Sequence, residues 1–134
     1  MKKEKKKFIY VIQEHFATHH HYDLRLEKNG VLWSWVIPKD PPLKPGIKRL
    51  AVRTENHSIK YADFEGEIEE GKYGAGKVKI WDKGSYELID EKNYKLVINI
   101  CGNKLKGVYV LVQFAGGKSS SKQKNWLFFK KRIS

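Results

Sequence analysis

Three metal-ligand side chains lie close together near the start of the chain, at His15, His21 and Asp23. From His21 onward the sequence alternates like a β-strand, so His21, Asp23 and Arg25 project from one face and apolar residues from the other. His15 can join that face if the segment between the two histidines bends. Two imidazoles and one carboxylate leave coordination positions open on a metal ion, which is typical of catalytic sites. Arg25 is then placed to bind an anionic group at the metal.

The elements that must position these side chains are short strands. Residues 22–27 and 31–37 flank the turn Lys28-Asn29-Gly30 and predict a hairpin. Further strands are predicted at residues 8–13, 48–54, 77–81, 85–88, 95–101, 107–114 and 125–132. No stretch keeps helical periodicity over three turns. The sequence therefore predicts an all-β fold, a small closed or partly open β-barrel with long loops and little helix.

Three other segments are predicted to be loops or turns. Residues 38–46 contain all four prolines and form a stiff, irregular loop. The segment Asp82-Lys83-Gly84 carries a hairpin signal. Residues 71–76 are rich in glycine, but the Gly-Lys-Ser/Thr ending of a phosphate-binding loop is missing, so hairpin turns are the better interpretation.

Length and composition predict one domain over residues 1–134, with a lysine-rich arm at 1–7 that we expect to be disordered. The single cysteine, Cys101, excludes a disulfide-stabilised fold and a cysteine-based zinc site, and we expect it to be a small buried thiol. No apolar run is long enough to span a membrane, so we expect a cytoplasmic protein with no membrane partner.

The formal net charge of +12 favours a polyanionic partner, and nucleic acid ranks before a membrane because no amphipathic basic helix can be drawn. The alternative to a polyanionic partner is a basic surface that only keeps the protein soluble.

The ordered motifs of the chain resemble the 3′-phosphoesterase domain of the multifunctional DNA ligase D. They cover most of the sequence: Gln13-x-His15, His21-Tyr22-Asp23-Leu24-Arg25-Leu26-Glu27, Trp35-x-x-Pro38-Lys39, Arg49-Leu50-Ala51-Val52, His57, Tyr61-Ala62-Asp63-Phe64-Glu65-Gly66, Gly71-x-Tyr73-Gly74-Ala75-Gly76 and Trp81-Asp82. The resemblance implies a manganese-dependent hydrolase, with Co²⁺ or Zn²⁺ as alternative ions. Such an enzyme removes a 3′-terminal ribonucleoside and then the 3′-phosphate, leaving a 3′-hydroxyl for end joining.

The same resemblance assigns a role to each site residue. It makes His15, His21 and Asp23 the metal ligands, and it makes Arg25, a protonated His57 and Tyr61 the catalytic groups at the phosphate. It adds Gln13, Lys39 and Arg49 as phosphate- or DNA-binding residues. The implied partners are DNA 3′ ends at primer-template junctions, including ribonucleotide-terminated ends, and a DNA ligase, a polymerase or the Ku protein in trans. Only seven residues precede Phe8, where longer members carry side chains that support ribonucleoside removal, so we expect that step to be the slower one.

Two rival interpretations stay open at this point. His21, Asp23 and His57 imitate the facial triad of iron(II) oxygenases, although that pattern leaves His15 without a role. A non-catalytic, basic nucleic-acid-binding barrel is the other alternative, and it predicts salt-sensitive binding without metal dependence.

Overall fold

The computed structural model describes residues 6–72, 75–114 and 124–132. Within these residues the elements are β1 (Phe8–Phe16), β2 (His21–Lys28), β3 (Val31–Ile37), β4 (Lys48–His57), the 3₁₀-helix η1 (Ile59–Asp63), β5 (Gly66–Ile68), β6 (Gly76–Lys92), β7 (Lys95–Cys101), β8 (Lys106–Gln113) and β9 (Asn125–Lys130). No helix in this part of the chain has the length and apolarity needed to cross a membrane.

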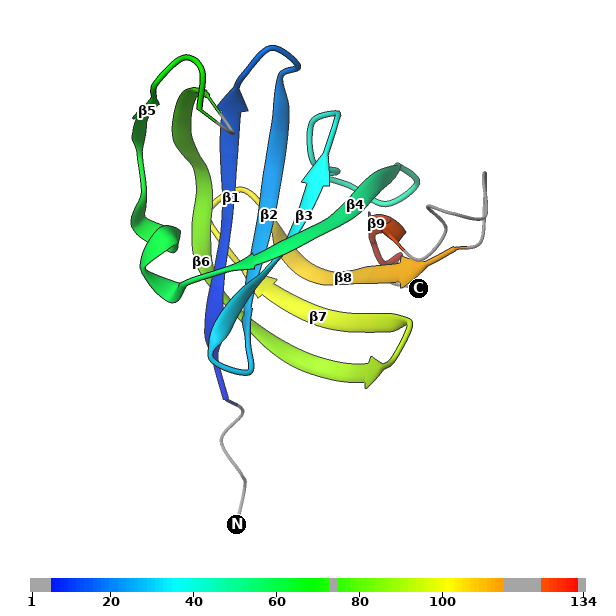
Figure 1. Ribbon diagram of the computed structural model, residues 1–134. Coiled ribbons are helices and arrows are strands. Elements are labelled where there is room, and N and C mark those ends of the chain that lie inside the picture. The colour runs from blue at the N-terminus through cyan, green and yellow to red at the C-terminus, as the bar shows by residue number, and fades with distance from the viewer. Residues whose placement is uncertain (1–5, 73–74, 115–123, 133–134) are drawn as a thin grey trace.

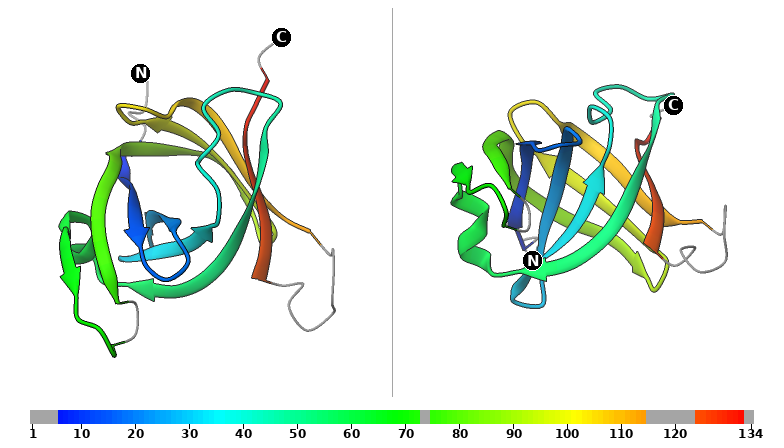
Figure 2. Two further views of the ribbon diagram at one scale, coloured as in Figure 1. Left: turned by 90° about the horizontal axis from the view of Figure 1, so that it is seen from above. Right: turned by 45° about the horizontal axis from the view of Figure 1, so that its top comes forward.

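Eight of the strands close into a barrel. The hydrogen-bonded order is β1-β2-β3-β4-β9-β8-β7-β6, every pairing is antiparallel, and β6 returns to pair with β1. The ring is visible when the molecule is seen from above in Figure 2. β5 pairs only with β6 and lies outside the ring. The predicted all-β barrel is therefore confirmed, in its closed form.

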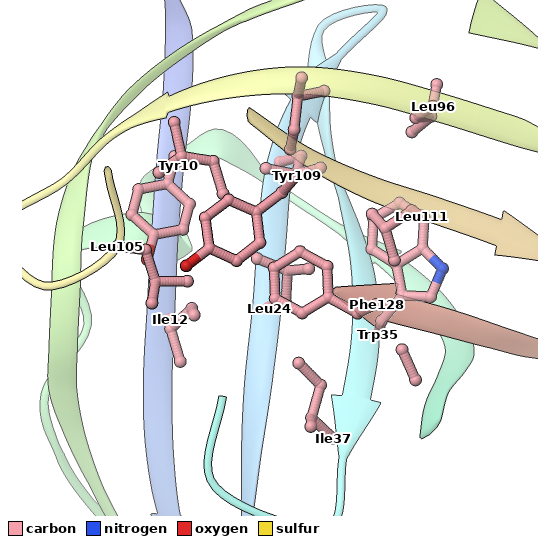
Figure 3. Packing of buried hydrophobic residues seen from close by; sticks show 14 of the residues in the cluster. Tyr10, Ile12, Leu24, Trp35, Ile37, Leu96, Leu105, Tyr109, Leu111 and Phe128 are labelled. Carbon is pink, nitrogen blue, oxygen red and sulfur yellow. The ribbon is translucent and has the colours of Figure 1, made fainter. Parts of the chain in front are cut away.

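The barrel interior is filled by large apolar side chains, as Figure 3 shows. Trp35, Tyr109 and Phe128 are among the largest side chains that are fully buried there. Tyr22, Leu24 and Leu26 of β2 also belong to this cluster, so the predicted apolar face of that strand points into the barrel. By alternation, His21, Asp23 and Arg25 project from the outer face.

Part of the outer face is covered by the segment that follows β4. Val11 of β1, Leu32 of β3 and Ala62 of η1 form a second, smaller buried cluster, with Tyr61 and Ile80 packed against it. Burying these residues fixes η1 against the outside of β1 and β3. The functional side chains of η1 are thereby held beside those of the β1–β2 hairpin.

The predicted hairpin at Asp82-Lys83-Gly84 is wrong, because β6 runs through this segment without a turn. The Asp82 carboxylate is buried and accepts hydrogen bonds from the Tyr10 hydroxyl and from the backbone N–H groups of residues 103–105. Gly84 serves a close approach of two strands: a Cβ there would lie 2.1 Å from the Cys101 carbonyl oxygen. Asp82 is thus explained by its hydrogen bonds to β1 and to the β7–β8 connection, and Gly84 by the close approach of β6 and β7.

Cys101 is exposed, at the end of β7, so the predicted buried thiol is wrong. Residues 38–47 form an irregular connection between β3 and β4, as the prolines predict. Backbone hydrogen bonds from Lys72 to Glu69 and from Ala75 to Lys72 are of the kind found in turns, while Tyr73 and Gly74 lie outside the described residues. The greater part of the predicted arm at 1–7 also lies outside them.

Candidate metal and phosphate site

The β1–β2 hairpin brings the three predicted ligands together. His15 pairs directly with His21, and Gln13 pairs with Asp23, so residues from both strands share the outer face. The potential ligand atoms of His15, His21 and Asp23 all lie within 4.8 Å of one another. Figure 1 shows the connection between β1 and β2 at the end of the barrel opposite the N-terminus.

The Asp23 carboxylate is the centre of this group. Its Oδ2 lies 3.4 Å from Nε2 of His21 and 3.7 Å from Nδ1 of His15. These separations exceed ordinary hydrogen bonds, whereas two ligands about 2.1 Å from one ion at a tetrahedral angle lie about 3.4 Å apart. Nε2 of His15 is buried and has no hydrogen-bond partner in the described structure. The three side chains therefore have the spacing of a ligand set.

Charge and hydrogen bonding prepare these groups to bind a cation. Burial alone would raise the pKa of Asp23, but its contacts with His15 and His21 and the charge of Arg25 outweigh burial and hold the pKa well below its usual range. The carboxyl is therefore ionised at neutral pH. Nδ1 of His21 lies 2.8 Å from the His19 carbonyl oxygen. Donation to that carbonyl fixes the tautomer whose Nε2 lone pair faces Asp23, as a metal ligand requires.

Arg25 lies beside the ligand set and is 5% exposed. Its Nε donates to Oε1 of Gln13 at 2.6 Å, and its Nη1 donates to Oγ of Ser34 at 2.8 Å. Nη1 also lies 3.1 Å from Nδ1 of His57, and Nη2 lies 3.7 Å from Oδ2 of Asp23. Burial lowers the pKa of Arg25 and Asp23 raises it, but a guanidinium remains charged in either case. The guanidinium is therefore held rigidly, with Nη2 directed toward the ligand group.

His57 and Tyr61 complete this side of the site. The Arg25 guanidinium carbon lies 4.8 Å from the centre of the Tyr61 ring, and the His57 and Tyr61 rings are 4.9 Å apart. Burial and the charge of Arg25 lower the pKa of His57, so its imidazole is neutral at pH 7 in the free protein. The protonated His57 expected at a bound phosphate stays a prediction. Burial raises the pKa of Tyr61, which keeps its hydroxyl protonated as a hydrogen-bond donor.

Together these groups line a cavity of about 440 Å³. Its polar side includes the three ligands, Arg25, His57 and Tyr61. The other lining residues come from the β1–β2 turn, β3, β4 and β5, and they are Ala17, Val36, Thr54, Glu55 and Ile68. Six of the nine predicted site residues therefore meet in one cavity.

The other three predicted residues do not line the cavity. Gln13 is fully buried and accepts a hydrogen bond from Nε of Arg25. Lys39 is exposed in the β3–β4 connection. Arg49 donates to the backbone and side chain of Asp40 in the same connection. Roles for Lys39 and Arg49 in DNA binding stay predictions.

The structure also shows site residues that the sequence reasoning missed. Ser34 is the clearest, because the hairpin around Lys28-Asn29-Gly30 places it directly opposite Arg25. That pairing register is a signal that could have identified it. For Thr54 and Glu55, the only indication in the sequence was that they precede His57 by two or three residues. The iron-oxygenase pattern is not formed among the described residues, since the third member of the cluster is His15 and not His57.

Comparison with known proteins gives one consistent result. The family model described as the DNA Ligase D 3'-phosphoesterase domain matches residues 13–113. The multifunctional non-homologous end joining protein LigD of Mycobacterium bovis is 44% identical over 113 residues, which are 81% of this chain and 15% of that protein. The LigD proteins of Mycolicibacterium smegmatis and Pseudomonas aeruginosa are each 43% identical, covering 88% and 90% of this chain and 16% and 15% of their own lengths. The chain thus corresponds to a small part of these relatives, and it belongs to the DNA ligase D 3′-phosphoesterase domain family.

Proposed function

We propose that this chain is a metal-dependent phosphoesterase that heals DNA 3′ ends for end joining. Its substrates are a 3′-phosphate and a 3′-terminal ribonucleoside, and its product is a 3′-hydroxyl. One observation carries the proposal: two imidazoles and an ionised carboxylate converge in a cavity beside a buried arginine. The family membership and the relatives' end-joining names support the choice of DNA ends as substrate.

A divalent cation fits the ligand set of His15, His21 and Asp23. The mixed nitrogen and oxygen donors suit manganese, cobalt or zinc, and manganese is our choice because the family resemblance favours it. When bound, such an ion supplies positive charge at the phosphoryl group and a more acidic water molecule.

The neighbouring residues of the chain bind and orient the phosphate. Arg25 faces the ligands through Nη2. Because Nε donates to Gln13, Nη2 and the Nη1 N–H near His57 are the groups that can donate two hydrogen bonds to phosphate oxygens. The Tyr61 hydroxyl remains a donor at neutral pH. Hydrolysis of the 3′-phosphate breaks the bond between phosphorus and the 3′ oxygen. The water oxygen joins phosphorus, and the 3′ oxygen ends with a proton, so the products are a 3′-hydroxyl and inorganic phosphate.

Nδ1 of His57 lies between a donor and an acceptor, so its hydrogen bond depends on whether it carries a proton. Its Nδ1 lies 3.1 Å from Nη1 of Arg25 and also 3.1 Å from the Glu55 carbonyl oxygen. An unprotonated Nδ1 accepts from Arg25, whereas a protonated Nδ1 donates to Glu55. We infer that an incoming phosphate, by drawing the hydrogen bonds of Arg25 to itself and adding negative charge, favours the protonated form. The predicted imidazolium would then exist in the complex and not in the free protein.

The proposal is tested with a primer-template that carries a 3′-phosphate. Protein stripped with a chelator is mixed with this DNA, with and without Mn²⁺, and released inorganic phosphate and primer mobility are measured. We expect phosphate release only with the metal, and none from His15→Ala. Tyr94→Ala, an exposed aromatic residue in the β6–β7 turn, is the control that should retain activity.

Two outcomes would contradict the proposal. Phosphate release that is equal with and without metal would exclude the metal-dependent mechanism. DNA binding that falls steeply with salt, without any turnover, would instead favour the non-catalytic nucleic-acid-binding barrel. A ligase, a polymerase and Ku remain proposed partners, and a cytoplasmic, nucleoid-associated location remains a proposal as well.

A further inference from the structure

A row of aromatic side chains lies on the reverse face of the hairpin that carries the ligands. In the β1–β2 pairing, His15 is opposite His21 and Glu14 is opposite Tyr22. Successive residues of a strand point to opposite faces, so Phe16, which follows His15, lies on the face of Glu14 and Tyr22. The residues before and after Phe16, His15 and Ala17, both line the cavity. Phe16 therefore lies between two lining residues along the chain, with its side chain on the opposite face of the hairpin.

This row is held in place by a chain of ring contacts. The rings of Phe16 and His20 stack at 5.0 Å and 30°, and His20 meets the Tyr22 ring edge-on at 5.2 Å. Tyr22 in turn meets Trp81 at 5.7 Å, and both residues pack in or against the barrel core. Nε2 of His20 lies 2.8 Å from a carboxylate oxygen of Glu14. Phe16 and His20 are thus held in place by their contact with Tyr22. Phe16 is 43% exposed.

Lysines flank this exposed pair on the neighbouring strand. In the β1–β6 pairing, Lys77 is opposite Phe16 and Lys79 is opposite Glu14. Side chains that are directly opposite in an antiparallel pair lie on the same face, with Cβ atoms about 4.5–5.5 Å apart. Both lysines are exposed. The reverse face of this hairpin therefore combines an exposed aromatic pair with two exposed cations. Proteins bind single-stranded nucleic acid with such surfaces, because bases stack on the rings and phosphates face the cations.

We propose that Phe16 and His20 form a stacking platform for a nucleobase at or next to the 3′ end, while Lys77 and Lys79 contact the adjacent backbone phosphates. The inference rests on the proposed function, because it assumes that the strand enters the cavity by its 3′ end. Stacking does not depend on base identity, since every base offers a π-face. The platform would therefore fix the end of the strand without selecting its sequence.

The experiment measures binding in the absence of metal, so that no turnover is needed. A primer-template with a 3′-phosphate carries either a fluorescent adenine analogue or an abasic residue at its last position, and Kd is determined by titration in a chelating buffer. We expect quenching of the analogue on binding. Phe16→Ala should raise Kd for the normal end by about tenfold, the size expected for the loss of one base–aromatic stack.

The abasic end separates stacking from a merely structural role. It has no base to stack, so Phe16→Ala should raise its Kd by less than about twofold. Phe16→Leu keeps an apolar side chain for packing and should behave as Phe16→Ala, whereas Phe16→Tyr should bind as the natural protein does. Tyr94→Ala is the matched control, because Tyr94 is a similarly exposed aromatic residue in the β6–β7 turn.

The outcomes distinguish this inference from the proposed function. Equal weakening of both ends by Phe16→Ala, or no weakening of either, would overturn the platform. Quenching with the expected variant pattern, but no metal-dependent phosphate release, would support the platform and contradict the proposed function.

Discussion

The Nε of Arg25 donates a hydrogen bond of 2.6 Å to Oε1 of Gln13, and both side chains are buried. The Gln13 amide nitrogen lies 2.8 Å from the Tyr61 carbonyl oxygen and 3.2 Å from that of Phe64. One amide therefore connects β1 to the arginine of β2 and to both ends of the turn that presents Tyr61. Gln13 positions the phosphate-binding groups although it does not line the cavity.

Gln13→Ala removes this connection. It leaves the charged Arg25 Nε and the Phe64 carbonyl without the Gln13 side chain, whereas the Tyr61 carbonyl keeps the Phe64 N–H as a donor. A buried unsatisfied group costs about 1–3 kcal/mol. We expect the free energy of unfolding to fall by about that amount, and kcat for 3′-phosphate removal to fall about a hundredfold, because a small misplacement of Arg25 is sufficient. Denaturant unfolding and steady-state kinetics measure the two effects. Gln13→Glu keeps the acceptor for Arg25 and should lose less activity; an unchanged kcat in Gln13→Ala would show that Arg25 is positioned without it.

Arg25→Lys should reduce kcat/KM for 3′-phosphate removal nearly as much as Arg25→Ala. A lysine cannot reproduce the fork that reaches Gln13 and Ser34 together, nor a bidentate contact with phosphate. Arg53→Lys is the control, since Arg53 is a partly buried arginine that packs over the Trp33 ring and does not line the cavity. A lysine variant at position 25 with normal kinetics would mean that only the charge matters.

Asp23→Asn should abolish the stabilisation of the protein by metal. An ion that binds only the folded state adds about 2.7 kcal/mol at a concentration of 100 times its Kd. Thermal unfolding with and without Mn²⁺ measures this, and calorimetric titration measures binding directly. The variant should show no metal-dependent shift in Tm, because a neutral amide is a weak ligand. If the shift persists, Asp23 is not a ligand.

The pH dependence of stability should reveal the resting state of His57. Its folded-state pKa is lowered by burial and by Arg25, so the unfolded chain binds the proton more readily. This residue therefore contributes stability that is present above its unfolded pKa of about 6.5 and is lost as the pH falls through the lower folded value. His57→Gln should lose less stability than the natural protein between pH 7 and pH 5, as measured by urea unfolding. The same loss in both proteins would show that the His57 pKa is not lowered.

Gly84→Ala should destabilise the barrel at the β6–β7 contact. The added Cβ would lie 2.1 Å from the Cys101 carbonyl oxygen, which is backbone and cannot move aside without separating the strands. We expect a loss of about 2 kcal/mol or more in the free energy of unfolding, of the size of other overpacking substitutions. The neighbouring change Ser85→Ala is the control and should cost little. Equal stability of the two variants would contradict the close approach.

Alternation along one strand was sufficient to predict part of the site. His21, Asp23 and Arg25 share a face because strand periodicity is a local property of the backbone. The same alternation predicted that Leu24 and Leu26 enter the core, as they do. The all-β class followed from equally local signals, namely short β-branched runs and the turns between them.

Alternation within one strand does not determine how the strands pair, and the pairing decided the positions of His15 and Gly84. His15 faces the ligand group because β1 pairs with β2 in one register, and a shift by one residue would turn it away. Gly84 was wrongly predicted to lie in a turn. It must be small because a carbonyl group of β7 lies against it, and the local sequence does not show that contact.

Contacts between distant segments were decided only by the tertiary structure. His57 reaches Arg25 because β4 pairs with β3 as far as His57, which lies opposite Leu32. Tyr61 reaches Arg25 because η1 packs over Val11 and Leu32. Burial is a property of the closed barrel, so sequence could not show that Cys101 is exposed or that the His57 pKa is lowered. The sequence determined which side chains could do chemistry, because residue type and strand period are local; the fold decided which of them meet, because register, packing and burial depend on the whole chain.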